Sequence, residues 1–282
     1  MQKSATYPPP PVVLCFSGHD PSGGAGIQAD IETLHRLGCH ACTVITALTV
    51  QDSTNVRAVL PQSAQRLVEQ AEAVMADMPI AAVKIGLLGS AELAAAVAGL
   101  VRRLGPVPLV LDPVLAAGGG TELAGEELIH RIRSDLLPFT TVLTPNSPEA
   151  RRLAGDTALD RCAAILLDAG CRHVLITGTH EDDDAPVTNR LYGSGGTASW
   201  RWPRLPHSYH GSGCTLASAL AGHLALGRSV QQAAFGAQAF TWNALVAGRA
   251  LGRGQHLPAR GCSAQAPATG AHSAESGFSG PA

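Results

Sequence analysis

Residues His210–Gly222, HGSGCTLASALAG, form a glycine-rich loop that leads into a predicted helix with Cys214 in its first turn. The free N–H groups and the positive dipole end of such a helix stabilise the negative charge that builds on a transferred phosphoryl group. The same dipole would favour the Cys214 thiolate, which could accept a proton from an attacking hydroxyl. An isolated cysteine is more often a buried structural residue, but the loop context favours the catalytic interpretation here.

A second glycine-rich segment, SGHDPSGGAGIQAD, runs from Ser17 to Asp30, directly after an apolar strand and into a helix. Its glycines let the backbone approach a ligand closely, and ligands in open α/β sheets bind beyond the carboxyl ends of strands. The segment lacks the G-K-[ST] of a Walker loop and does not match G-x-G-x-x-G. A tight strand-to-helix turn without a ligand is an equally good interpretation of this segment alone.

Acidic and amide side chains follow other predicted strands. Asp112 ends one strand, and Asn146-Ser147-Pro148-Glu149 begins the helix after another. Phosphoryl transfer from a nucleotide requires Mg²⁺, and one or two carboxylates suffice to hold the ion or its waters. Taken alone, each residue is an ordinary turn or helix-start residue. Gln51, also at a strand end, offers an amide that donates and accepts, which suits the edge of an aminopyrimidine; a solvated glutamine is the alternative.

The elements that must position these residues alternate between short apolar strands and longer helices, which predicts a mostly parallel sheet with helices on both faces. The predicted strands are 12–17, 42–50, 80–87, 108–111, 140–143 and 173–177, and the predicted helices include 63–76, 91–104, 157–169, 213–226 and 230–250. Between Val187 and Leu205, two strand-like pieces flank a glycine-rich turn, which predicts a β-hairpin or flap.

The composition bounds the size and class of the protein. Of 282 residues, 45% are hydrophobic and 15% charged, enough for one large core. We expect one domain over residues 12–260, an N-terminal extension over 1–11, and a disordered tail over 261–282, where the sequence is small, polar and rich in Pro and Gly. A net charge of −2 excludes a broad basic field for nucleic acid. No apolar run has the length of a membrane span, and the odd number of cysteines fits no disulfide framework, so we expect a cytoplasmic protein.

Six segments occur in order and with natural spacing: SGHDPSGGAGIQAD, ITALTVQDS, VKIGLL, LVLDPV, LTPNSPEA and YHGSGCTLASALA. Together they closely resemble the hydroxymethylpyrimidine/phosphomethylpyrimidine kinases of thiamine biosynthesis, members of the ribokinase-like superfamily, over about residues 12–257. The resemblance implies a three-layer α/β/α fold with a small β-hairpin flap, and ATP and Mg²⁺ as cofactors. It implies transfer of the γ-phosphoryl group to the 5-hydroxymethyl oxygen of 4-amino-5-hydroxymethyl-2-methylpyrimidine, and typically a second transfer onto the monophosphate.

The resemblance also implies a role for each matching residue. Gln51 resembles the residue that binds the pyrimidine edge, with Gly18, Asp20, Asp30 and Leu87 near the same pocket. Gly211, Ser212 and Gly213 resemble the anion hole, and Cys214 resembles the base. Asp112 and Glu149 resemble the magnesium group, while Asn146, Glu149, Thr177 and Gly178 resemble the nucleotide-binding residues. Family habit implies a homodimer that acts on a small molecule.

Two stretches depart from the family pattern. Members often have Lys-Gly-Gly-His where this chain has Thr177-Gly178-Thr179-His180, and a basic residue in the loop that here is LAAGGG, 115–120. We therefore expect two phosphate-facing charges to be absent, which bears on ATP binding and on the second phosphorylation. A pyridoxal or pyridoxine kinase is the nearest alternative, because its substrate is also a flat heterocycle with a hydroxymethyl group. A non-catalytic pyrimidine-binding protein is the alternative from another class.

Overall fold

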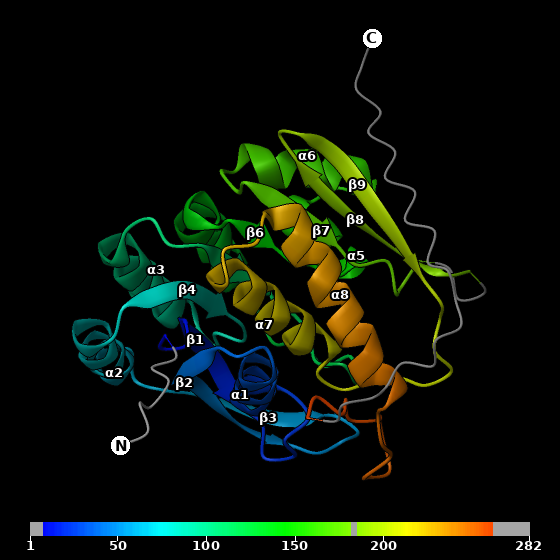
Figure 1. The fold of residues 1–282 in the computed structure, drawn as a ribbon, viewed down its shortest axis with the longest axis horizontal. Helices are drawn as coiled ribbons and strands as arrows, with labels where there is room; N and C mark the ends of the chain where they lie inside the picture. Colours follow the sequence, from blue (N-terminus) through cyan, green and yellow to red (C-terminus); the bar gives the residue numbers. More distant parts are fainter. Residues whose placement is uncertain (1–7, 182–184, 262–282) are drawn as a thin grey trace, which may run out of the picture.

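Strand β1 (Val12–His19) lies inside the sheet because its apolar residues are buried on both faces. The computed structural model describes residues 8–181 and 185–261. Parallel to β1 run β2 (His40–Gln51), β4 (Ile80–Ile85), β5 (Leu109–Leu111), β6 (Val142–Leu143) and β7 (His173–Ile176). Each corresponds to one of the predicted apolar runs, so the expected mostly parallel sheet is confirmed (Figure 1).

Three antiparallel strands complete the sheet, whose order in the described residues is β3-β2-β1-β4-β5-β6-β7-β8-β9. Strand β3 (Val56–Pro61) pairs with β2 at one edge and was not predicted. The predicted hairpin is present as β8 (Val187–Gly193) and β9 (Gly196–Trp202). The flap interpretation was wrong, because β8 pairs with β7 and the hairpin extends the main sheet at its other edge.

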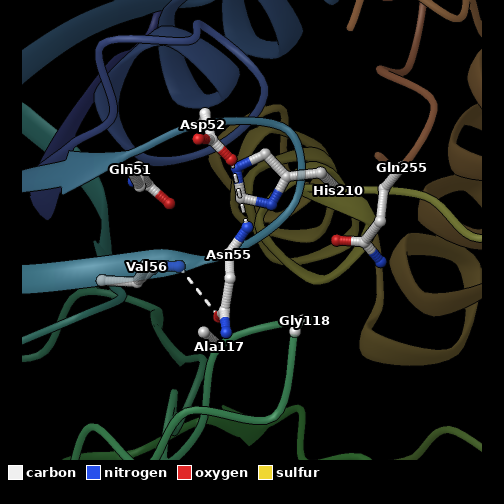
Figure 2. A pocket seen from close by; sticks show the side chains of 9 residues that line it. Gln51, Asp52, Asn55, Val56, Ala117, Gly118, His210 and Gln255 are labelled. Carbon is white, nitrogen blue, oxygen red and sulfur yellow. Dashed lines mark hydrogen bonds between the residues drawn. The ribbon is translucent and has the colours of Figure 1, made fainter. Parts of the chain in front are cut away.

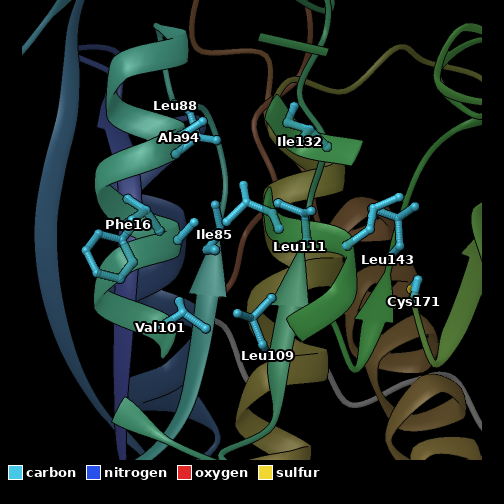
Figure 3. Close-up of a cluster of buried hydrophobic side chains, with 14 of the residues drawn as sticks. Phe16, Ile85, Leu88, Ala94, Val101, Leu109, Leu111, Ile132, Leu143 and Cys171 are labelled. Carbon is cyan, nitrogen blue, oxygen red and sulfur yellow. The ribbon is translucent and has the colours of Figure 1, made fainter. Parts of the chain in front are cut away.

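Helices cover both faces of the sheet. One face carries α2 (Ala64–Asp77), α3 (Ala91–Leu104), α4 (Glu126–Arg131), α5 (Ser147–Ala154) and α6 (Leu159–Asp168), with the single turns η1 (Ile132–Leu136) and η2 (Leu137–Phe139). Figure 3 shows this core, in which Phe16 and Ile85 lie beside Ala94 and Val101 of α3, and Leu111 lies between Ile85 and Leu143. Full burial of each large apolar side chain contributes about 1.5–3 kcal/mol, so this layer is a main source of stability.

The other face carries α1 (Gly26–Arg36), α7 (Ser212–Ala225) and α8 (Val230–Val246). Helix α7 is buried along nearly its whole length, between the sheet and α8 (Figure 1). Its alanines, such as Ala217 and Ala221, permit this close packing. The two helical layers with the sheet between them confirm the predicted three-layer α/β/α fold.

The ends of the chain and the cysteines complete the description. Residues 8–11 precede β1 without regular structure, while residues 1–7 of the expected extension and 262–282 of the expected tail lie outside the described residues. Cys39 and Cys42 have C-x-x-C spacing, yet they lie in different cores: the Cys39 thiol donates to the Gly222 carbonyl, and the Cys42 thiol contacts Met78. Within residues 8–181 and 185–261, no helix has the length and apolar character needed to cross a membrane.

Candidate active site

A cavity of about 600 Å³ opens at the carboxyl ends of the parallel strands. The chain order reverses here, because β1 lies between β2 and β4, and such a switch point is where open α/β sheets bind ligands. Both glycine-rich segments line the cavity. Of the predicted site residues, those in the lining are Gly18, Asp20, Gln51, Leu87, Asp112, Asn146, Glu149, Thr177, Gly211, Ser212, Gly213 and Cys214.

The first glycine-rich turn is ordered by Asp20. Its carboxylate accepts hydrogen bonds from the Ser22 amide at 2.8 Å, the Ser22 hydroxyl at 2.9 Å and the Ala25 amide at 2.8 Å. It also contacts Nε2 of His210 at 2.8 Å. Burial would raise the pKa of Asp20, but the hydrogen bonds of His210 and Ser22 lower it to about 2. Asp20 is therefore an ionised anchor that ties this turn to the second glycine-rich segment.

The two glycine-rich segments touch each other directly. A Cβ on Gly211, whose φ is +83°, would lie 1.9 Å from the Gly24 carbonyl oxygen, and one on Gly24 would lie 2.4 Å from Cδ2 of His210. Helix α7 begins at Ser212, so its first amides, which lack helical partners, are at the cavity wall beside this contact. This juxtaposition produces a backbone cradle suited to an anion.

Cys214 lies in the first turn of α7 and lines the cavity. Burial raises the pKa of its thiol to about 11, with Lys84 acting in the opposite direction. This net shift is opposite to the one that the helix dipole alone would produce, because loss of solvation outweighs the favourable charge of Lys84. In the free protein the Cys214 thiol is protonated at neutral pH.

Lys84, near the end of β4, places a fully buried ammonium at the cavity wall. Its Nζ lies 2.8 Å from Asp30 Oδ1 and 2.8 Å from the Ser17 hydroxyl. Burial alone would lower the pKa of Lys84, but Asp30, together with Cys214 and Asp112, raises it above its ordinary range. Lys84 is therefore charged, and it supplies a fixed cation beside the cradle.

Asp30 does not line the cavity, contrary to its expected place near the pyrimidine pocket. It is fully buried in α1, where Oδ1 accepts from Ser218 of α7 at 2.5 Å and pairs with Lys84, while Oδ2 has no hydrogen-bond partner. Its position in the fold makes it the counter-ion of Lys84. The sequence signal for this pair was a lysine inside the otherwise apolar run Ile80–Ile85, because a charge in a buried strand requires a partner.

Asp112 and Glu149 bring two carboxyl groups to the same part of the cavity. Burial raises the pKa of Asp112 to about 6, against the opposing charge of Lys84. Burial and then the Asp112 charge raise the pKa of Glu149 to about 8. Glu149 also accepts from the Asn146 amide at 2.9 Å and the Leu115 amide at 3.2 Å, so it caps α5 as well.

These carboxyl groups fit a divalent cation, because the Asp112 charge raises the pKa of Glu149 and a bound cation would neutralise that charge. Among residues 8–181 and 185–261, no group of three or more His, Cys, Asp or Glu side chains is arranged to hold a metal. In proteins, Mg²⁺ is often held by one or two carboxylates together with water and substrate phosphates.

The Gln51 end of the cavity is surrounded by four chain segments. Figure 2 shows Gln51, Asn55, Gly118, His210 and Gln255 around one small hollow, which adjoins the main cavity. Gln51 Nε2 donates to the Thr49 hydroxyl at 2.6 Å, which leaves the Gln51 carbonyl for a ligand. The covering loop has no room for a side chain at Gly119, because a Cβ there would lie 2.8 Å from the Thr54 carbonyl oxygen.

The end of the cavity beside the hairpin and α8 was not predicted from the sequence, apart from Thr177. It is lined by Val187, Trp202, Leu216, Gln238, Thr241, Trp242 and Leu245. Gln238 Oε1 accepts from Asn189 Nδ2 and from Trp202 Nε1, both at 2.9 Å. Thr177 lines this region, whereas Gly178 does not; its amide donates to Asn189 Oδ1 at 3.1 Å. The sequence signal for this region was the pair Trp200 and Trp202, which alternate with Arg201 and so share one face of the strand.

Comparison with known proteins assigns the family. A family model described as phosphomethylpyrimidine kinase matches residues 20–259. A hydroxymethylpyrimidine/phosphomethylpyrimidine kinase from Streptomyces coelicolor is 41% identical over 260 residues, which cover 89% of this chain and 95% of that protein. The protein of the same description from Bacillus subtilis is 36% identical over 231 residues, with 78% and 83% covered.

Solved structures agree with the fold. A pyridoxal kinase from Staphylococcus aureus in complex with pyridoxal has a TM-score of 0.83 at 27% identity, covering 91% of this chain and 95% of that one, and the same protein has been solved with ADP. A phosphomethylpyrimidine kinase from Clostridium difficile has a TM-score of 0.72 at 32% identity, covering 82% and 97%. With its two glycine-rich segments joined at one cavity, this chain therefore belongs to the phosphomethylpyrimidine kinase family and has the ribokinase-like fold.

Proposed function

We propose that this protein transfers the γ-phosphoryl group of ATP to the 5-hydroxymethyl oxygen of 4-amino-5-hydroxymethyl-2-methylpyrimidine, and then to the resulting monophosphate. One observation carries the proposal: the first turn of α7, the Ser17–Asp30 segment and Gln51 line a single cavity. We assign the Gln51 end of this cavity to the acceptor, the amide cradle to the phosphates, and the end beside the hairpin and α8 to the nucleotide. The kinase family of the chain implies the use of ATP.

The acceptor would lie between Gln51 and Cys214. Gln51 offers a free carbonyl to the pyrimidine amino group, and the side chain of Leu87 lies close to the backbone of Gly18, which together form an apolar wall for a flat ring. The hydroxymethyl oxygen would then face Cys214. At neutral pH this thiol can donate a hydrogen bond, and it can serve as a base only where the Lys84 cation stabilises the thiolate.

The phosphates would lie on the α7 amides Ser212–Cys214, with Lys84 behind them and Asn146 and Thr177 toward the nucleotide. Asp112 and Glu149 would hold Mg²⁺, which supplies charge neutralisation to the phosphates when bound. This chain's own contribution is positioning: the loop contact and the helix start fix the acceptor and phosphates in line without a large movement. Lys84 supplies a fixed positive charge, whereas the basic residues that family members often have in the 115–120 loop and at position 177 are absent from this chain.

Pyridoxal phosphorylation is a second candidate activity, supported by the similarity to the pyridoxal kinase solved with pyridoxal. A coupled assay of ADP release under Mg²⁺ and ATP, with the free pyrimidine, its monophosphate and pyridoxal in parallel, tests both. We expect the highest kcat/KM with the pyrimidine and a measurable rate with its monophosphate. A higher kcat/KM with pyridoxal would make this a pyridoxal kinase. Saturable pyrimidine binding without ADP release would make it a binding protein.

Three wider properties belong to the same proposal. We place the protein in the cytoplasm, because the cysteines of the described residues are free thiols, as in a reducing compartment. We propose a homodimer formed through the exposed apolar side chains of Leu48, Val50 and Leu60 on β2 and β3. We also propose that residues 12–260 form the kinase domain, with 1–11 and 261–282 as accessory ends.

A further inference from the structure

Arg260 is a buried cation outside the cavity whose position calls for an explanation. Its exposed fraction is 3%, and it does not line the cavity. It ends the segment after α8, which folds back along the body: the Ala259 amide donates to the Ala244 carbonyl, and His256 pairs with Tyr209. The segment therefore delivers the Arg260 side chain to the rear of the two glycine-rich segments.

The guanidinium of Arg260 bridges those two segments. Its Nε donates to the Thr215 hydroxyl at 2.8 Å, Nη2 donates to the Gly24 carbonyl, and Nη1 lies 3.5 Å from the Gly23 carbonyl. The Thr215 hydroxyl in turn donates to the Gly211 carbonyl at 2.8 Å. A continuous chain of hydrogen bonds thus runs from the first glycine-rich turn, through Arg260, to the loop that begins α7.

The charge balance around Arg260 is unlike that of a purely structural ion pair. Among residues 8–181 and 185–261, its carboxylate partner is Glu32, at 3.2 Å, whose side chain is 37% exposed. The other acceptors are two neutral carbonyls and a hydroxyl. Burying a guanidinium against neutral groups is unfavourable unless its donors are satisfied in a fixed geometry. The rigid planar fork of arginine meets this requirement, and a lysine does not.

Glycines cannot fix the separation of the two segments by themselves. Gly24 and Gly211 are in backbone contact, and neither has room for a side chain. A rigid group that holds their carbonyls at a set separation would therefore fix the amides of the first turn of α7, whose geometry decides how well they stabilise a transferred phosphoryl group.

We propose that Arg260 is a positioning residue for phosphoryl transfer: from behind the cavity it clamps the Gly23–Gly24 turn against the first turn of α7. The inference rests on the proposed function for its effect on catalysis, but the clamp itself has a readout that does not depend on activity. Arg260 does not line the cavity, so its removal should lower kcat more than it weakens acceptor binding.

The test compares Arg260→Met and Arg260→Lys with the native chain. Activity is expressed per folded molecule, with the folded fraction taken from near-ultraviolet circular dichroism. A misplacement of about 1 Å can reduce turnover on the order of 10²-fold, so we expect kcat to fall at least about tenfold in Arg260→Met and less in Arg260→Lys. We expect KM for the pyrimidine to stay within about threefold, because Gln51 is untouched.

Hydrogen exchange supplies the second readout. We expect faster amide exchange at residues 23–25 and 212–215 in both variants, and unchanged exchange in the β4–β5 core. Thr215→Val breaks the same chain of bonds at its other end, so its effect on kcat and that of Arg260→Met should be less than additive. Glu32→Gln removes only the half-exposed ion-pair partner, and we expect it to leave kcat and exchange unchanged.

The outcomes separate the clamp from the proposed function. If the native chain releases no ADP with any acceptor, the proposed function fails, while the exchange data still decide whether the clamp exists. If Arg260→Met does not fold, Arg260→Lys and Thr215→Val carry the test. Native kcat together with native exchange in those two variants would overturn the proposal, as would an equal loss in Glu32→Gln, which would point to a simple ion pair.

Discussion

At the residue scale, the ion pair of Lys84 and Asp30 is shielded from solvent more completely than any exposed ion pair of the described residues. Both side chains have exposed fractions of 0%. Such a pair contributes little net stability over apolar residues, but removal of one partner leaves an uncompensated buried charge. Its retention beside the amide cradle is therefore better explained by the cation that it provides to the cavity than by stability.

Lys84→Met should lower both stability and turnover. We expect the free energy of unfolding, measured in urea, to fall by about 3–5 kcal/mol, because Asp30 remains buried without its counter-ion. Adding Asp30→Asn should recover much of the stability but not kcat, because the cation is still missing. The control, Arg103→Met, breaks the half-exposed pair with Glu72 and should cost less than about 1 kcal/mol. Recovery of kcat in the double variant would show that Lys84 has only a structural role.

Cys214 should titrate as a buried thiol. With a pKa of about 11, the thiol stays protonated below that pH, and the thiolate fraction rises about tenfold per pH unit from pH 7 to 10. We expect the alkylation rate of Cys214 by iodoacetamide, followed by peptide mass spectrometry, to rise in the same way. Cys214→Ser identifies the signal. A rate that levels off below pH 9 would mean that the start of α7 lowers the pKa after all.

At the scale of elements, the hairpin β8–β9 is joined to α8 and to the turn after β7 through polar side chains. Gln238 of α8 accepts from Asn189 of β8 and from Trp202 of β9, and Asn189 in turn accepts from the Gly178 amide. The end of the cavity beside the hairpin and α8 is therefore built from three elements that one network holds together. A mobile flap would not carry such a network. The network therefore supports the assignment of the hairpin to the sheet, which the pairing of β8 with β7 already indicates.

Gln238→Leu should disturb this end of the cavity. The substitution removes the acceptor of the buried Asn189 amide, and an unsatisfied buried group costs about 1–3 kcal/mol. We expect that loss of stability in urea, and a higher KM for ATP with little change in KM for the pyrimidine. Gln65→Leu, whose partner Glu69 lies on the surface of α2, should change neither quantity. An equal rise of both KM values would mean that the network supports the whole cavity and not its nucleotide end.

At the scale of the whole molecule, the sequence predicted the sheet and most of the site because both depend on local patterns. Apolar runs such as 12–17 and 80–87 defined strands, and glycine-rich turns after them defined the cavity. Strand β3 was missed because its residues, VRAVLP, form an edge strand without a continuous buried face. Asp30, Lys84 and Arg260 were misplaced or missed because their partners come from distant segments, and one sequence does not specify such pairings.

The edge of the sheet formed by β2 and β3 exposes apolar side chains that a second protein chain would cover. On β2 and β3, Leu48, Val50 and Leu60 are 40%, 43% and 51% exposed, and Leu48 lies directly opposite Leu60. Side chains alternate along a strand, so all three project from the same face, away from the buried Ala47 and Thr49. A cluster of exposed aliphatic side chains beside an edge strand favours association with another chain.

Leu48→Lys combined with Leu60→Glu should therefore convert the proposed homodimer into monomers. The substitutions place charges where apolar surface would be buried, while the monomer core is untouched because both residues point outward. Sedimentation equilibrium at micromolar concentration measures the change, with urea unfolding of the monomer as the check on its fold. Leu226→Lys, at a 42% exposed position at the end of α7, is the matched control and should leave the dimer intact. A native chain that sediments as a monomer would contradict the proposed assembly, and a dimer that survives both edge substitutions would assign its interface to another surface.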